Sequence, residues 1–310
     1  MGQELGGQVP STRPLTTVDK CPSCVSLPSM AAGLPEPFAR SSSAWFISRP
    51  SGTVAERRVL LEAADVLADN PNSQLRTWSG TDAGSHCLWE GVQCDAETGL
   101  VYELDVSGKE LTGRIPPVLS SLRAMEYLYI QGNGLEGCIP PELGAMSSLQ
   151  VLMARGNQLS GSIPAEISGM SSLQYLDLAD NHLSGAIPPS LGAMEALEYM
   201  GLENNTLSGA IPSELGLLDN LYDMYLQNNQ LTGSIPEAFS SLKYLLNLYL
   251  NDNQLTGSIP LELSTLALEE LVVHHNYLTG DLMAQLAKLG WSIETLERLD
   301  VYPQNLPAYE

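Results

Sequence analysis

Apolar residues recur in a fixed pattern every 24 residues from Val101 onward. One copy reads Leu173-Gln-Tyr-Leu176-Asp-Leu178 and continues to Asn181. Side chains alternate across a strand, so positions three to seven of each copy predict a short strand with inward leucines at positions four and six. A fixed period of this length predicts a solenoid in which each unit buries its apolar edge against its neighbours. The copies start at Val101, Met125, Leu149, Leu173, Leu197, Leu221, Leu245 and Leu268, with a partial ninth at Leu296.

The remaining positions of the unit are typical of scaffold. Position nine is asparagine in seven copies, and its amide can satisfy backbone groups where the chain leaves the strand. The glycine four residues later fits a turn that needs a permissive φ, and the proline three residues after it ends strand pairing. Residues 189–194 and their equivalents predict short helical turns on the outer side. Met146, Met170 and Met194 replace leucine there and are interpreted as core filler.

The sequence before the repeats divides into two regions. Residues 1–52 are rich in Ser, Pro and Gly and have no sustained apolar period, which predicts a disordered leader. Residues 54–69 carry apolar side chains at helical spacing and predict a helix, with Glu56 on its polar side. Trp78 and a C-x-W-x-G-V-x-C motif over residues 87–94 follow this helix. A capping unit is expected here, because the first repeat would otherwise expose its apolar edge.

The L-x-x-L-x-L-x-x-N-x-L pattern and its continuation L-(S/T)-G-x-I-P resemble the plant-type leucine-rich repeat of receptor-kinase ectodomains and polygalacturonase-inhibiting proteins. The helix, tryptophan and two-cysteine motif are similar to the N-terminal cap of the same proteins. The resemblance implies an α/β solenoid, that is, a leucine-rich-repeat right-handed superhelix with a concave parallel β-sheet and an N-terminal helical cap. It also implies a disulfide between Cys87 and Cys94.

The expected organisation is a leader over residues 1–52, an N-terminal cap with the cysteine pair over 53–100, and repeats over 101–310. The far end is less regular, and residues 281–288 predict a longer helix. The cysteine-bearing C-terminal cap of many extracellular relatives is absent. Either residues 281–306 form the cap or the chain is incomplete, and the sequence leaves both open.

The charge balance narrows the class of partner. A net charge of −22 disfavours nucleic acid and anionic membranes and favours basic partners. The cap disulfide that the resemblance implies indicates an oxidising compartment. However, no run of seven apolar residues follows Met1, so no secretory signal is recognisable, and no 18-residue apolar span predicts a membrane helix. The cap motif favours an extracellular or cell-surface location, with a cytoplasmic one as the alternative.

The sequence contains no arrangement of residues typical of an enzyme, so we expect no catalytic activity and no cofactor. Cys21 and Cys24 have half-zinc spacing but lack a second pair. His274 and His275 are neighbours on a predicted strand, so we expect their side chains to diverge and expect no metal site. Asp177 is at an outward position and is expected to solvate the sheet.

Tyrosine and acidic residues gather at the outward positions three, five and seven of the repeats, which together we call the concave face. Tyrosine suits strands and stacks with cross-strand neighbours, which gives it a structural interpretation. It also brings large contact area with a polar tip and is enriched at binding hot spots. Because solenoids commonly bind partners on this surface, we favour recognition. The predicted ligand-binding residues are Tyr127, Tyr129, Tyr175, Asp177, Tyr199, Glu203, Asp223, Tyr225 and Tyr249.

The sequence therefore predicts a non-catalytic protein or peptide recognition module, a receptor-like ectodomain that binds a basic ligand on an acidic, tyrosine-rich concave face. Two alternatives follow from the same resemblance: an inhibitor of a cell-wall polygalacturonase, and the extracellular fragment of a receptor-like kinase whose kinase domain is missing. A purely structural spacer is a third.

Overall fold

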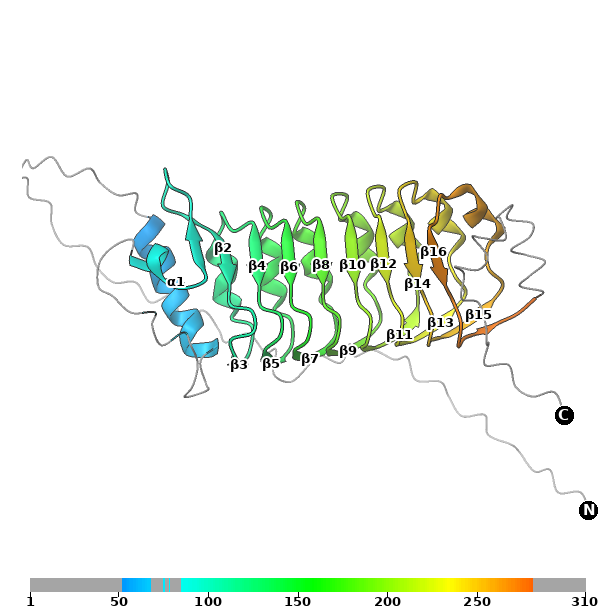
Figure 1. Ribbon diagram of the computed structural model, residues 1–310, viewed down its shortest axis with the longest axis horizontal. Helices are drawn as coiled ribbons and strands as arrows, with labels where there is room; N and C mark the ends of the chain where they lie inside the picture. The colour runs from blue at the N-terminus through cyan, green and yellow to red at the C-terminus, as the bar shows by residue number, and fades with distance from the viewer. Residues whose placement is uncertain (1–51, 68–74, 76–77, 79–84, 281–310) are drawn as a thin grey trace, which may run out of the picture.

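The computed structural model describes residues 52–67, 75, 78 and 85–280. These residues form an elongated solenoid with helix α1 (Gly52–Leu67) across one end (Figure 1). Residues 1–51 of the predicted leader, and the predicted helix and ninth repeat after residue 280, lie outside the described residues. Gly52, the last residue of the predicted leader, is instead the first residue of α1. Within the described part, no helix combines the length and the apolar character that crossing a membrane requires.

Each repeat contributes one strand to a main parallel sheet of nine strands, in which β1 alone runs antiparallel to its neighbour β2. Equivalent positions pair in register, so Tyr199 lies opposite Tyr175 on one side and Asp223 on the other. The strands are β1 (Val92–Cys94), β2 (Val101–Asp105), β4 (Tyr127–Tyr129), β6 (Val151–Met153), β8 (Tyr175–Asp177), β10 (Tyr199–Gly201), β12 (Asp223–Tyr225), β14 (Asn247–Tyr249) and β16 (Glu270–Val272).

The strands are shorter than predicted, ending at position five and not at position seven. Positions six and eight still donate to the next repeat: Leu178 N lies 2.8 Å from Gly201 O, and Asp180 N lies 3.0 Å from Glu203 O. At position eight the backbone turns, because Asp180 has a positive φ of 52°. This left-handed residue ends the extended conformation.

A second parallel sheet, which the sequence analysis did not predict, follows positions ten to thirteen along the lower edge in Figure 1. A buried leucine such as Leu183, between two polar neighbours, gives each of these strands its alternation. The strands are too short for that alternation to be distinguished from a turn in the sequence. They are β3 (Thr112–Gly113), β5 (Gly134–Gly137), β7 (Gln158–Gly161), β9 (His182–Gly185), β11 (Thr206–Ala210), β13 (Gln230–Gly233), β15 (Gln254–Gly257) and β17 (Tyr277–Leu278).

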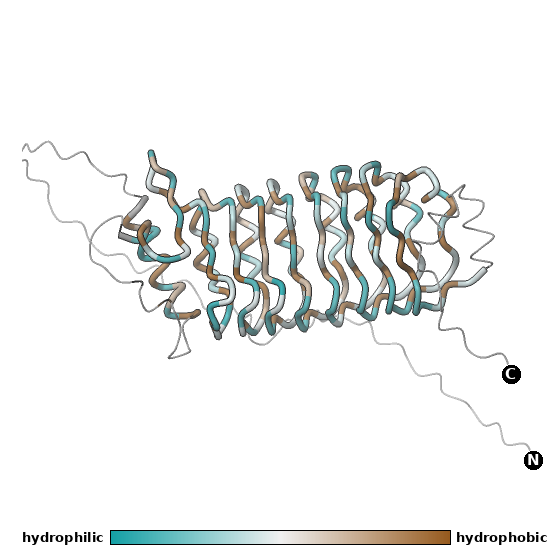
Figure 2. The backbone as a smooth tube through the Cα atoms, in the orientation of Figure 1, coloured by the Kyte–Doolittle hydropathy of each residue, from teal (hydrophilic) through white to brown (hydrophobic). Residues whose placement is uncertain are grey.

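Short 3-10 helices cover the side opposite the main sheet, as the sequence predicted. Each follows the repeat's proline, whose fixed φ suits the entry to a helical turn. Apolar and polar segments recur at the same level in successive repeats (Figure 2). Met146, Met170 and Met194 are buried as predicted. The 3-10 helices of the repeats are Pro117–Ser121, Pro141–Ala145, Ala165–Gly169, Pro189–Ala193, Ser213–Leu217, Glu237–Ser241 and Leu261–Thr265.

The asparagines at position nine form a hydrogen-bonded ladder through the interior. Asn181 Oδ1 accepts from Leu159 N (3.0 Å), and its Nδ2 donates to the carbonyls of Ala154 (3.1 Å), Leu178 (3.1 Å) and Ala179 (2.9 Å). All four contacts recur at Asn205, and three of them recur at Asn157. The prediction that these residues are scaffold is confirmed.

The cap closes the apolar end of the first repeats. Leu60, Ala63 and Leu67 of α1 are buried, as their spacing predicted. Glu56 was predicted on the polar side of the helix, but it is buried. Its carboxylate points to the start of β2, where it accepts a hydrogen bond from Val101 N (2.9 Å). Burial raises the pKa of Glu56, and the bond from Val101 lowers it in part.

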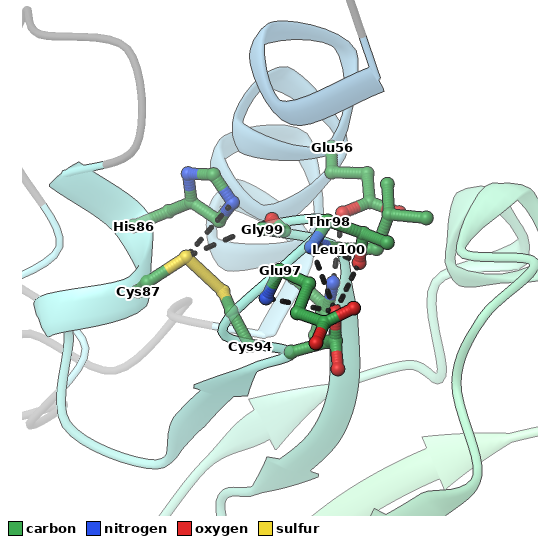
Figure 3. Close-up of a disulfide and its surroundings, with 10 residues drawn as sticks. Glu56, His86, Cys87, Cys94, Glu97, Thr98, Gly99 and Leu100 are labelled. Atoms are coloured by element: carbon green, nitrogen blue, oxygen red, sulfur yellow. Dashed lines mark hydrogen bonds between the residues drawn. A yellow bond between two sulfur atoms is a disulfide. The ribbon is translucent and has the colours of Figure 1, made fainter. Parts of the chain in front are cut away.

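A disulfide joins Cys87 to Cys94 beside α1 (Figure 3). The 3-10 helix Ser85–Leu88 and strand β1 present the two cysteines. Trp89 lies between them in sequence and stacks on Trp78, with ring centroids 5.4 Å apart. The cap thus holds its small apolar cluster by both a covalent bond and aromatic packing.

Candidate ligand-binding face

The six predicted tyrosines all lie on the concave face, on strands β4, β8, β10, β12 and β14. Each is partly buried, while the residues that alternate with them, such as Leu176 and Met224, are fully buried. Val151 and Met153 of β6 separate the tyrosines into an N-terminal group and a central row.

The central row extends over four successive repeats. Tyr175 and Tyr199 stack in parallel, with ring centroids 4.0 Å apart and planes 3° apart. Tyr199 then contacts Tyr225 at 5.4 Å, and Tyr225 contacts Tyr249 at 5.0 Å. The hydroxyl of Tyr249 donates to the carboxylate of Glu270. These contacts produce a continuous aromatic surface with phenol oxygens along it.

Gly201 explains why Tyr199 lies flat on the sheet. A Cβ at this position would stand 2.9 Å from Cε1 and 3.1 Å from the hydroxyl of Tyr199, and 3.1 Å from Oδ1 of Asp177. The missing side chain therefore makes room for the ring. Burial raises the pKa of Tyr199, and the nearby charge of Asp177 raises it further.

The N-terminal group includes Tyr102, which the sequence analysis missed because it occupies position two. Its ring meets that of Tyr127 edge-on at 6.5 Å, and Tyr127 lies 6.5 Å from Tyr129 on the same strand. The hydroxyl of Tyr102 donates to Gln93 Oε1 (2.8 Å), and that of Tyr127 donates to Gln150 Oε1 (3.3 Å). This group is looser than the central row.

Asp177 and Glu203 are buried, which corrects the expectation that Asp177 solvates the sheet. Their exposed fractions are 2% and 5%. Asp177 accepts from Ala179 N (3.1 Å), while Glu203 pairs with Arg155 Nη1 (2.7 Å). The second nitrogen of Arg155 pairs with Asp180 Oδ2 (2.7 Å). Arg155 thus reaches across one repeat, which has only the small Ala179 at position seven.

The carboxyl groups around the buried pair outnumber the positive charges beside them. Burial raises the pKa of Asp177, and the Ala179 N–H and the Arg155 charge lower it in part. Burial also raises the pKa of Glu203, against the lowering effect of its own backbone N–H and of Arg155. Oε2 of Glu203 is buried and makes no hydrogen bond. Among the described residues, Arg155 is therefore the one positive charge beside three carboxyl groups, those of Asp177, Asp180 and Glu203.

The wider face is acidic as well. Across the eight described repeats, Arg155 is the one lysine or arginine at the outward positions. Asp223, a predicted site residue, accepts from Asn247 Nδ2 (2.6 Å) and is partly exposed. The carboxylates at the outward positions are Glu103, Asp105, Asp177, Glu203, Asp223 and Glu270.

An open hollow of about 360 Å³ lies beside the stacked pair Tyr175 and Tyr199, at the edge where the strands begin. Its wall combines aromatic rings with two carboxylates. Such a lining suits an ammonium or guanidinium group, since a cation gains from both ring faces and opposite charge. The lining residues are Val151, Gln174, Tyr175, Glu198, Tyr199, Tyr222 and Asp223.

His274 and His275 do not diverge as predicted. Their ring centroids lie 4.7 Å apart, and both rings reach Asp252 in the preceding repeat. The reason is the positive φ of 52° at His275, which breaks the alternation of a strand. In the cap, His86 lies beside Cys87 and Cys94, whose sulfur atoms are committed to the disulfide.

Comparison with known proteins identifies both parts of the described chain. The leucine rich repeat N-terminal domain matches residues 55–95, and leucine rich repeat families match residues 124–146, 148–170, 172–194 and 219–278. The MDIS1-interacting receptor like kinase 1 of Arabidopsis thaliana is 39% identical over 72 residues, which cover 23% of this chain and 7% of the kinase.

Two solved structures of plant receptors share the fold. The PEPR1–AtPEP1 structure has a TM-score of 0.73 at 28% identity and covers 82% of this chain and 35% of that chain. The ectodomain of the Arabidopsis receptor kinase HAESA, in complex with an extended IDA peptide hormone, has a TM-score of 0.71 at 30% identity. That match covers 82% of this chain and 42% of that one, so the chain spans less than half of either ectodomain. The chain belongs to the plant-type leucine-rich-repeat proteins, and its solenoid is that of the plant receptor ectodomains.

Proposed function

We propose that the chain is a non-catalytic recognition module that binds a basic peptide or protein segment on its concave face. The observation that carries this proposal is the central row, Tyr175, Tyr199, Tyr225 and Tyr249, packed against the buried carboxylates of Asp177 and Glu203. Rigid aromatic area next to incompletely neutralised charge is the composition of a binding hot spot for a cation.

The structural relatives support a peptide ligand. PEPR1 and HAESA are described with AtPEP1 and with the IDA peptide hormone. This chain shares their solenoid over most of its length, and an extended peptide can lie along consecutive repeats as the central row does. A receptor-like role outside the cell or at its surface is consistent with these relatives and with the cap disulfide.

The acidic side chains and the tyrosine rings of the concave face have separate roles in this proposal. The acidic face increases the association rate of a basic ligand, and this effect is screened by salt. The rings contribute contact area that salt screens little, so they slow dissociation. A peptide with alternating basic and apolar residues would place a cation at the open hollow and apolar side chains on the row.

Selection of ligands from a random peptide library displayed on phage, with the immobilised full chain as bait, tests the proposal. We expect enrichment of sequences rich in lysine and arginine, and binding that weakens as salt increases. Selection of neutral or acidic sequences, or binding that a Tyr199→Ala variant retains in full, would contradict it. Tyr277→Gln is a matched control, because Tyr277 is exposed away from the concave face and glutamine occupies its position in other repeats, as at Gln230.

A further inference from the structure

The ring nitrogens of His274 and His275 and the carboxylate of Asp252 converge at the junction of the seventh and eighth repeats. His275 Nδ1 lies 2.8 Å from Asp252 Oδ1, and His274 Nε2 lies 3.7 Å from Asp252 Oδ2. All three donor groups have ligand atoms within 4.8 Å of one another. We propose that they bind a divalent transition-metal ion of the zinc class, which clamps the eighth repeat to the seventh.

The chemistry of the donor set selects the class of ion. Two imidazoles and one carboxylate suit zinc, copper, nickel and cobalt, whereas calcium and magnesium prefer oxygen ligands. Zinc binds nitrogen and oxygen ligands at about 2.0–2.2 Å, so two ligands of one tetrahedral ion stand about 3.4 Å apart. The observed separations bracket this value. Both separations between a histidine and Asp252 are thus close to the tetrahedral value, and the proposed site needs rotation of the side chains to bring all three donors to one ion.

The backbone that carries the histidines is already fixed. His274 O accepts from Asp252 N (3.1 Å) and from Asn276 Nδ2 (3.2 Å), and His275 O accepts from Asn253 N (3.3 Å). The carboxylate is held as well, because Asn251 Nδ2 donates to Asp252 Oδ2 (2.7 Å). Such outer contacts orient metal ligands and lower the cost of assembling the site.

The site departs from the repeat in the residues that supply donors. Position seven is glutamine at Gln131 and Gln227. Position eight is asparagine at Asn204 and Asn228, where φ is 55° and thus close to the 52° of His275. Here both positions carry histidine, opposite a carboxylate of the preceding repeat. Histidine thus stands where some other repeats have a neutral amide, and the backbone at position eight keeps the same left-handed conformation.

The repeat itself supplies variants that keep the fold. His274→Gln and His275→Asn restore residues found at the same positions in other repeats. His182→Gln is the matched control, since His182 is exposed at position ten, where other repeats carry glutamine, as at Gln158 and Gln230.

Cobalt binding to the metal-free full chain, followed by visible absorption, tests the site, with zinc competition and the zinc-dependent shift of the melting temperature as second readouts. We expect zinc-displaceable cobalt bands in the wild type and in His182→Gln, and an affinity at least tenfold weaker in His274→Gln/His275→Asn. Zinc should raise the melting temperature of the first two proteins and leave that of the double variant unchanged. Equal affinity in the double variant, or cobalt spectra with intense thiolate bands in the near ultraviolet, would overturn the proposal.

Discussion

The interior asparagine ladder and the concave face run in parallel along the solenoid, and they differ in how strictly they follow the repeat. Position nine is asparagine in seven consecutive copies, and Asn181 and Asn205 make the same contacts. Positions three and five instead change from copy to copy, with Val151 in one repeat, Tyr199 and Gly201 in another. An interior position meets the same neighbours at every step, whereas the concave face has only solvent or a ligand to satisfy.

The comparison separates stability from recognition. Residues that repeat without change hold one unit to the next, and residues that vary shape a particular surface. Arg155, Asp177 and Glu203 stand between these two groups, because they are packed like interior residues but belong to no repeated pattern. Variants of each kind test this distinction.

The largest effect on stability is expected for Asn181→Ala. The change leaves Leu159 N–H and the carbonyls of Ala154, Leu178 and Ala179 without their side-chain partner. Loss of these buried bonds should lower the free energy of unfolding by about 3 kcal/mol, measured by urea denaturation. Asn220→Ala, which removes one exposed bond to Glu195 O, should cost less than about 0.5 kcal/mol. Equal losses in the two variants would contradict a special role for the ladder.

An intermediate effect is expected for Arg155→Ala. The variant leaves Glu203 and Asp177 buried without a counter-charge, which should lower the free energy of unfolding by about 1–2 kcal/mol at pH 7. The folded-state pKa values of both carboxyls are raised above their ordinary values of 3.8 and 4.5. Each carboxyl therefore favours folding at low pH and loses that contribution as pH rises through its folded pKa.

Without Arg155 the two carboxyls should take up protons at still higher pH, because the positive charge that lowers their pKa is gone. The difference in stability between wild type and Arg155→Ala should then be greatest at neutral pH and shrink as pH falls through the raised pKa values of the two carboxyls. Urea denaturation at a series of pH values measures this difference. A gap that stays constant from pH 7 to pH 4 would show that the arginine acts through packing and not through charge.

A small effect on stability is expected for Gly201→Ala. The added methyl group meets the ring of Tyr199 and not backbone, so the ring moves and the free energy of unfolding changes by less than about 1 kcal/mol. The stacking of Tyr175 on Tyr199 should be lost, which near-ultraviolet circular dichroism detects. An unchanged spectrum would show that the row does not depend on the missing side chain.

The repeated part of the fold was predictable because each prediction concerned a position that recurs. The asparagine ladder, the buried methionines and the placement of six tyrosines on one face follow from the period alone. The second sheet was missed because its strands are only two to five residues long, as β3 and β11 show. So brief an alternation carries no distinctive period.

The details of the candidate site depend on contacts between repeats, which no single repeat encodes. Arg155 meets Glu203 across 48 residues, and Gly201 matters only because Tyr199 folds over it. The convergence of His274 and His275 could have been predicted from the residue types at position eight, but we assumed the alternation of a strand there. Position eight carries Gly, Asp or Asn in other copies, which are residues that tolerate a left-handed backbone.

Affinity for a selected basic peptide, measured with stability in the same preparations, tests the central account most directly. A Tyr175→Ala/Tyr199→Ala/Tyr225→Ala variant should lose roughly 2 kcal/mol or more of binding free energy, about thirtyfold in Kd, while its denaturation midpoint changes little. Tyr277→Gln should bind as the wild type does. Unchanged affinity in a folded triple variant would contradict the account and move the binding surface away from the concave face.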